Sequence, residues 1–256
     1  MIYGIDISNW QEGLEIQSLP KDVQFVICKV SEGTSFHDWT STKFIHDTLE
    51  NGLLMGFYHY ALGMNPEMEA EWFVENSREY FHHGIPVLDY EINASYGNLS
   101  ESEWCEAFMN RVHELTGCWC MLYTYASKLT CFQETWLPAR CGLWLAGYPN
   151  GYTQFERLFP PYNSNPWPYM PIWQFTSILH IDGWNGNLDG NIAYMNTSDW
   201  KNYYGDNMEN TEKIAEAVWG YNYENTIRGG NTIYDEIAAI YDMVAEIKKE
   251  IENGKY

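Results

Sequence analysis

Short runs of apolar and β-branched residues recur along most of the chain, and residues that favour turns bound each run. Such runs predict buried strands, because amphipathic helices need longer stretches with apolar positions three or four apart. Eight runs occur, at residues 2–8, 23–30, 53–61, 85–92, 119–126, 141–148, 170–177 and 187–195. A closed β/α barrel has eight strands, so this number favours that fold.

Helical patterns lie between several of these runs, at residues 42–51, 66–81 and 100–115. The third pattern begins with Ser100 and Glu103, which form a capping box ahead of apolar positions. Regular alternation of strand and helix predicts a parallel barrel. In such a barrel the active-site residues follow the carboxyl ends of the strands.

The pattern becomes less regular after the sixth predicted strand. Residues 149–169 are rich in Pro, Asn and aromatic residues, which predicts a long loop in place of a helix. We therefore expect an α/β fold, a modified and partly irregular (β/α)8 barrel of the TIM type, followed by a C-terminal helical segment.

The composition changes near residue 199, which divides the chain into a barrel domain at 1–203 and a linker with a helical segment at 204–256. Apolar residues of the second part recur at spacings of 4, 3, 4, 3 and 4, as a heptad seam: Ile233, Ile237, Ile240, Val244, Ile247 and Ile251. A helix of this length is marginal in water by itself. The seam therefore packs on its own barrel or joins chains into a homo-oligomer.

The chain carries 35 acidic and 14 basic residues, a formal net charge of −21. This charge repels nucleic acid and anionic membranes, and no stretch approaches the roughly 20 apolar residues that cross a bilayer. We therefore expect neither nucleic-acid binding nor membrane insertion. Tryptophan and tyrosine are abundant, with 12 and 20 residues, which suits a cleft for neutral sugars and equally an ordinary core.

The six cysteines lack the paired C-x2-C spacing of zinc sites. Several lie in apolar runs, where a reduced cysteine packs as a small hydrophobic residue. The start, MIYGIDISNW, has neither the basic region nor the cleavage site of a signal peptide. We expect free thiols and synthesis in a reducing cytoplasm.

Two carboxylates close the fourth predicted strand. Asp89 and Glu91 are two residues apart, so on a strand they point to the same face. Two like charges at this distance disfavour joint ionisation and raise one pKa, which makes a general acid near neutral pH from an ordinary carboxyl group. Glycoside cleavage needs such a proton, with negative charge beside an oxocarbenium-like centre. A solvated strand end or a metal site would show the same pair.

Acidic residues also lie toward the ends of the first and last predicted strands, at Asp6 and Asp189. A barrel brings these strand ends together, so we expect four carboxyl groups at one mouth. A metal could use the same four groups, but the nearby His59 lacks the spaced partners of a histidine metal motif. We therefore expect no metal and no cofactor, and a packed, hydrogen-bonded role for His59.

Six motifs follow one another along the first 200 residues: GIDISNWQ, FVICKVSEG, GFYHYA, VLDYE, PIWQF and LDGN. In this order they resemble the family 25 glycoside hydrolases, the Chalaropsis-type lysozymes, many of which are phage endolysins. The resemblance implies a modified β/α barrel that cuts the β-1,4 bond between N-acetylmuramic acid and N-acetylglucosamine in bacterial peptidoglycan.

The resemblance also implies roles for the four acids. Carried over by motif, Glu91 is the proton donor and Asp89 orients or stabilises the N-acetyl group of the substrate. Asp6 and Asp189 complete the catalytic cluster. Either a protein nucleophile or the substrate's own acetamido group fits, and we favour the second. The candidates for substrate binding, each of which also suits packing at a strand end, are Glu32, Tyr58, Tyr60, Tyr125, Trp144 and Gln174.

A phage or prophage endolysin is the cellular role that the resemblance implies. We expect synthesis in the host cytoplasm and release to the cell wall through a holin. The alternatives are a barrel that binds the cell wall with weak catalysis and a chitinase-like glycosidase. The C-terminal segment lies outside the catalytic fold of the family, and oligomerisation and wall attachment both remain open for it.

Overall fold

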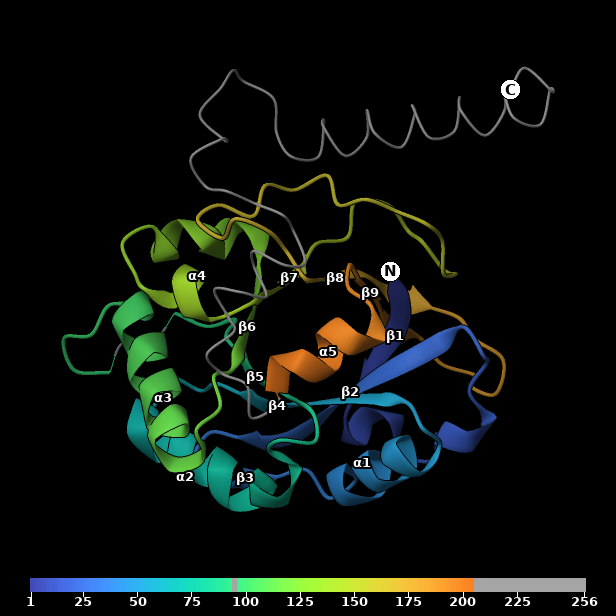
Figure 1. The fold of residues 1–256 in the computed structure, drawn as a ribbon, viewed down its shortest axis with the longest axis horizontal. Coiled ribbons are helices and arrows are strands. Elements are labelled where there is room, and N and C mark those ends of the chain that lie inside the picture. The colour runs from blue at the N-terminus through green and yellow to red at the C-terminus, as the bar shows by residue number, and fades with distance from the viewer. Residues whose placement is uncertain (94–95, 205–256) are drawn as a thin grey trace. The chain divides into compact units, whose positions relative to one another are not determined.

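Eight strands close into a barrel in the computed structural model, which describes residues 1–93 and 96–204 (Figure 1). The barrel strands are β1 (Ile2–Ile7), β2 (Val23–Glu32), β4 (Leu54–Tyr60), β5 (Ile85–Asp89), β6 (Met121–Tyr125), β7 (Leu143–Ala146), β8 (Ile172–Leu179) and β9 (Leu188–Ala193). They pair in the order β1, β9, β8, β7, β6, β5, β4 and β2, and β2 pairs with β1 to complete the ring. A short strand, β3 (Phe36–His37), pairs with the end of β2. The predicted barrel is confirmed.

The direction of the last strand differs from the prediction. β9 runs antiparallel to both of its neighbours, β1 and β8, whereas strand–helix alternation predicted parallel strands throughout. Residues 180–187 alone separate β8 from β9, and this is too short for a helical crossover. The reversal places Asp189, near the start of β9, opposite Asp6, near the end of β1. Both acids therefore reach the same mouth of the barrel.

Helices cover one side of the barrel, and irregular chain covers the other (Figure 1). The main covering helices are α1 (Ser41–Glu50), α2 (Pro66–Ser77) and α3 (Glu101–Thr116). Ser100 caps α3 with both hydrogen bonds of the predicted capping box. Shorter elements are η1 (Asn9–Gln11), η2 (Ile16–Ser18), η3 (Arg78–Tyr80), η4 (Ala126–Phe132) and α4 (Leu137–Arg140). Residues 147–171 form the predicted long loop between β7 and β8, without helix or strand.

Alternate residues of the strands point into the barrel and fill it below the mouth. The buried inner cluster includes Phe25, Ile27, Ile85, Val87, Met121, Trp144 and Ile172. A second cluster lies between the strands and the helices outside them. The two clusters follow from the period of two along a strand, because every residue that faces the interior is followed by one that faces the helices.

A helix that the sequence pattern did not predict covers the opposite end of the barrel from the mouth. This helix is α5 (Thr197–Tyr204), and its Trp200 is completely buried. The ring of Trp200 lies 4.7 Å from that of Phe25, and its indole Nε1 donates a hydrogen bond of 3.2 Å to the carbonyl of Met55. Because Phe25 and Met55 lie near the starts of β2 and β4, α5 closes the amino-terminal end of the barrel.

The predicted heptad seam at residues 233–251 lies outside the described residues, and its role stays a prediction. Within the described part, no helix has the length and apolar character needed to cross a membrane. All six cysteines are free thiols.

Candidate active site

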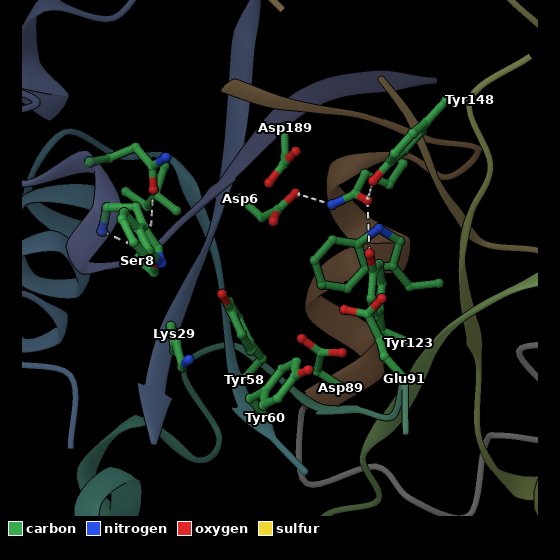
Figure 2. Close-up of a pocket in the computed structure, with 15 residues that line it drawn as sticks. Asp6, Ser8, Lys29, Tyr58, Tyr60, Asp89, Glu91, Tyr123, Tyr148 and Asp189 are labelled. Atoms are coloured by element: carbon green, nitrogen blue, oxygen red, sulfur yellow. Dashed lines mark hydrogen bonds between the residues drawn. The ribbon is translucent and has the colours of Figure 1, made fainter. Parts of the chain in front are cut away.

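A pocket of about 380 Å³ opens at the carboxyl ends of the parallel strands (Figure 2). Strand register brings its acidic residues together. Asp6 lies opposite Asp189 across β1 and β9, and Asp89 lies opposite Tyr60 across β5 and β4. The residues that line the pocket are Asp6, Ile7, Ser8, Trp10, Gln11, Lys29, Tyr58, Tyr60, Asp89, Glu91, Tyr123, Trp144, Tyr148, Gln174 and Asp189. The four predicted acids therefore share one cavity.

Asp6 is buried near the end of β1, and two side-chain amides hold its carboxyl group. Gln174 Nε2 and Asn191 Nδ2 donate to Asp6 Oδ2 at 2.9 and 2.7 Å. The indole of Trp144 donates to Asn191 Oδ1 at 2.8 Å. An indole N–H can only donate, so the amide of Asn191 has to turn its N–H groups toward Asp6. The hydroxyl of Tyr123 donates to Gln174 Oε1 at 2.8 Å and supports the corresponding orientation there.

Asp89 and Glu91 reach the pocket from different backbone settings. Asp89 is the last residue of β5, whereas Glu91 lies beyond the strand. The prediction that the two side chains share one strand face is therefore wrong. Tyr90 between them is completely buried, and its backbone N–H donates to the carbonyl of Tyr123 at 2.9 Å. This bond fixes the backbone just beyond the strand end, and the side chains of Asp89 and Glu91 both line the pocket. Asp89 Oδ1 is buried and has no hydrogen-bond partner among the described residues.

Burial raises the pKa of all four carboxyl groups. Desolvation raises the pKa of Asp6 to about 6, against the hydrogen bonds that it accepts from the two amides. Desolvation and then the charges of Asp6 and Glu91 raise the pKa of Asp189 to about 8. Burial, followed by the charge of Glu91, raises the pKa of Asp89 well above its ordinary value, and burial also raises the pKa of Glu91. The cluster therefore retains protons near neutral pH.

Ionisation of Asp189 is expected to lower the free energy of unfolding of the wild type as pH rises. The substitution Asp189→Asn should abolish this part of the pH dependence. An acid whose pKa is raised by folding binds more protons in the folded than in the unfolded state between its two pKa values, so the free energy of unfolding falls as pH rises. For Asp189 this window runs from 3.8 to about 8. We expect the variant to melt several degrees above the wild type at pH 8 and at the same temperature at pH 4, in thermal scans followed by circular dichroism.

The control for this measurement is Asp182→Asn, because Asp182 is exposed and lies in the same β8–β9 connection. Its melting temperature should follow the wild-type pH dependence. If Asp189→Asn also follows that dependence, Asp189 does not hold its proton in the folded protein as its burial indicates.

Four of the six predicted binding residues line the pocket: Tyr58, Tyr60, Trp144 and Gln174. Glu32 and Tyr125 are not among the lining residues. Glu32 Oε2 forms an ion pair of 2.6 Å with Lys29 Nζ. The hydroxyl of Tyr125 donates to the backbone carbonyl of Glu91 at 3.4 Å. Both side chains therefore contact residues of the pocket from outside it.

Several polar and aromatic lining residues were not identified from the sequence: Ser8, Trp10, Gln11, Lys29, Tyr123 and Tyr148. Ser8 and Gln11 form a capping box around η1, and this turn presents Trp10 at the pocket with 82% of its surface exposed. The S-x-x-Q pattern was a usable signal for that turn. Lys29 follows Phe25 and Ile27 at the period of two, which could have placed it on the inner face of β2.

His59 faces away from the pocket. Its imidazole contacts Ser31 Oγ at 2.9 Å and Glu69 Oε2 at 3.0 Å, and all three residues are completely buried. Burial lowers the pKa of His59. Glu69 also accepts hydrogen bonds from the backbone N–H groups of Leu62 and Met64, which fixes the loop between β4 and α2. The packed, hydrogen-bonded setting agrees with the role expected for His59.

Within residues 1–93 and 96–204, the metal-ligand side chains that gather most closely lie outside the pocket. His46, Asp47 and Glu50 offer ligand atoms within 4.8 Å of one another on α1. Asp47 already pairs with Lys43 at 2.7 Å. The pocket lining contains carboxyl groups without His or Cys, and burial raises the pKa of all four of them. The arrangement therefore suits proton transfer.

Comparison with known proteins identifies the class of this site. The family model for glycosyl hydrolases family 25 matches residues 5–184. The chain belongs to this family. The matched segment contains Asp6, Asp89 and Glu91, and β9 with Asp189 follows it. The protein is a glycoside hydrolase of the lysozyme class.

Relatives in family 25 support this membership. The chain is 28% identical over 214 residues to the N,O-diacetylmuramidase of Chalaropsis sp, a match that covers 75% of this chain and 95% of the relative. It is 25% identical over 205 residues to lysozyme M1 of Streptomyces globisporus, with 74% and 67% covered. The solved family 25 lysozyme of Aspergillus fumigatus superposes with a TM-score of 0.64 at 25% identity, over 80% of this chain and 99% of that one.

The catalytic domain of endolysin ply40, from bacteriophage P40 of Listeria monocytogenes, has the same fold. It superposes on this family 25 chain with a TM-score of 0.62 at 26% identity, over 79% of this chain and 96% of that domain. The described barrel thus corresponds to a nearly complete family 25 catalytic domain.

Proposed function

We propose that this family 25 enzyme hydrolyses the β-1,4 bond between N-acetylmuramic acid and N-acetylglucosamine in bacterial peptidoglycan. The observation that carries the proposal is the group of four carboxyl groups around one pocket, all with raised pKa values. A glycosidic bond breaks when its oxygen receives a proton and the oxocarbenium-like centre is stabilised. The names of the relatives, an N,O-diacetylmuramidase and a lysozyme, point to the same polymer.

Glu91 is the proton donor in this proposal, because it is half-buried in the pocket and burial raises its pKa. In the free protein, burial and the charge of Glu91 raise the pKa of Asp89 well above its ordinary value, so the proton of the pair lies on Asp89. The acetamido N–H of a bound sugar is a suitable donor for the unpartnered Asp89 Oδ1. That bond favours ionised Asp89, and the proton then passes to Glu91. Substrate binding thus protonates Glu91, the proton donor.

The acetamido group of the sugar serves as the nucleophile. Its carbonyl oxygen attacks the anomeric carbon while the bond to the leaving oxygen breaks, and the proton of Glu91 goes to that oxygen. The Glu91 carboxylate then takes a proton from the water that reopens the oxazolinium ring, which restores both groups. Asp6 and Asp189 titrate as a pair with pKa values of about 6 and about 8, so one of them carries negative charge beside the reacting centre at neutral pH.

Digestion of purified Gram-positive cell walls tests the assignment. Borohydride reduction and mass spectrometry of the products identify the sugar at each new reducing end. N-acetylmuramic acid there supports the proposal. N-acetylglucosamine there, with cleavage of chitin oligosaccharides, would favour a chitinase-like glycosidase. Binding to walls without release of sugar would favour a wall-binding barrel.

The substitution Trp10→Ala is expected to raise KM for soluble glycan strands about tenfold with little change in kcat, a loss of about 1.4 kcal/mol. Trp10 is 82% exposed at the pocket, where its ring can stack on the face of a sugar remote from the reacting bond. Michaelis kinetics on peptide-free strands measure the effect. Trp39→Ala is the control, because Trp39 is 57% exposed and does not line the pocket. A KM equal to the wild-type value would exclude Trp10 from substrate binding.

We further infer a cellular role as a phage endolysin that is made in the host cytoplasm and reaches the wall through a holin. The similarity to the ply40 catalytic domain supports this role, and six free thiols suit a reducing compartment. Expression in a bacterium with and without a holin tests it. Lysis that requires the holin is the expected result, and lysis without it would contradict the proposed route.

A further inference from the structure

We propose that Lys29 makes the pocket selective for muramic acid by binding the 3-O-lactyl group of that sugar through its ammonium. The inference rests on the proposed function and deepens it. Muramic acid differs from glucosamine by this lactyl ether, which ends in a carboxylate, or in an amide carbonyl where a peptide stem is attached. An ammonium group recognises both, because it donates hydrogen bonds to either oxygen.

Lys29 is the cationic residue of the pocket lining. It lies opposite Tyr58 in the β2–β4 register, near the carboxyl end of β2. Its side chain is 12% exposed, and Figure 2 shows it at the pocket near Tyr58 and Tyr60. Its charge lowers the pKa of Asp89, against the larger effect of burial. The field of the ammonium thus reaches Asp89.

The backbone holds Lys29 in this position through an irregularity in β2. The β2–β4 register shifts between Lys29 and Ser31, so Glu32 instead of Ser31 comes to lie opposite Tyr60. A bulge of this kind re-aims side chains at the rim of a barrel. Glu32 Oε2 then accepts from Lys29 Nζ at 2.6 Å, and the ring of Tyr60 lies 5.0 Å from the same nitrogen.

The ion pair leaves donor capacity for a ligand. An ammonium has three N–H groups, and Glu32 accepts from one of them. Glu32 does not line the pocket, so it holds the ammonium from outside the cavity. The remaining charge in the pocket comes from those of the four carboxyl groups that are ionised, and these repel an anionic lactyl group. A carboxylate-bearing sugar therefore needs the cation, whereas a neutral glucosamine unit does not.

The test compares two forms of one substrate. Peptide-free glycan strands, prepared with an amidase, carry lactyl carboxylates, and carbodiimide activation followed by borohydride converts these groups into alcohols. The measured quantity is the ratio of kcat/KM for native strands to that for reduced strands. We expect Lys29→Met to lower this ratio about 10- to 100-fold, mainly through KM on native strands, and Lys29→Arg to recover most of it. Lys43→Met, at an exposed lysine on α1, should keep the wild-type ratio.

A binding measurement covers the case in which reduced strands are cleaved too slowly. In the Glu91→Gln background, calorimetric dissociation constants for the two strand types should show the same loss of preference on Lys29→Met. An equal effect of Lys29→Met on both strand types would overturn the inference and leave Lys29 as a general electrostatic partner of Asp89. Absence of hydrolysis by the wild type on native strands would instead refute the proposed function.

Discussion

Replacement of Glu91 by Gln is expected to lower kcat on purified cell walls by about 1,000-fold or more. Glutamine keeps the size of the side chain but cannot deliver a proton to the leaving oxygen. The pocket and its remaining acids stay in place, so KM should change little. The rate of reducing-sugar release at saturating substrate measures the effect, and circular dichroism verifies the fold. The variant should also lose the pH dependence that ionisation of Glu91 gives the wild type, because the amide does not titrate.

The matched control is Glu75→Gln, the same change at an exposed position of α2. This variant should keep wild-type activity. If Glu91→Gln releases sugar as fast as the control, the proton donor is another of the pocket acids, and Asp89 is the next residue to substitute because its pKa is also raised by burial.

Replacement of Trp200 by Ala is expected to cost about 3–5 kcal/mol of unfolding free energy, the range for truncation of a buried aromatic residue. Trp200 fills the amino-terminal end of the barrel against Phe25, and its indole hydrogen bond to the Met55 carbonyl would also be lost. Domains of this size have a total stability of about 5–15 kcal/mol, so the loss is a large fraction of it. Urea unfolding followed by tryptophan fluorescence and circular dichroism measures the change.

Trp39→Ala serves as the stability control, because Trp39 is 57% exposed and its truncation leaves no cavity of this kind. Its unfolding midpoint should stay close to that of the wild type. If Trp200→Ala behaves like this control, α5 does not contribute to the folded barrel, and the domain would be stable without its last helix.

The pocket acids could be recognised in the sequence because Asp6, Asp89 and Asp189 each interrupt an apolar strand pattern. Asp6 and Asp89 lie at strand ends as predicted, whereas Asp189 lies near the start of the reversed β9 and Glu91 lies beyond β5. The residues that form hydrogen bonds to these acids could not be identified from the sequence in the same way. Asn191 reaches Asp6 across a separation of 185 residues, and the local pattern gives no reason to choose it from the other polar residues of the chain.

Local pattern by itself determined the eight strands, the helices on one side and the long loop before β8, because the period of apolar positions and turn residues act over a few neighbours. Only the tertiary structure decided the reversal of β9, the closure by α5 and the position of Lys29 among the acids. Each depends on contacts between distant segments. The short β8–β9 connection allows pairing in one direction only, and Trp200 is buried by strands far earlier in the chain. The bulge in β2 is defined only by the pairing of β2 with β4.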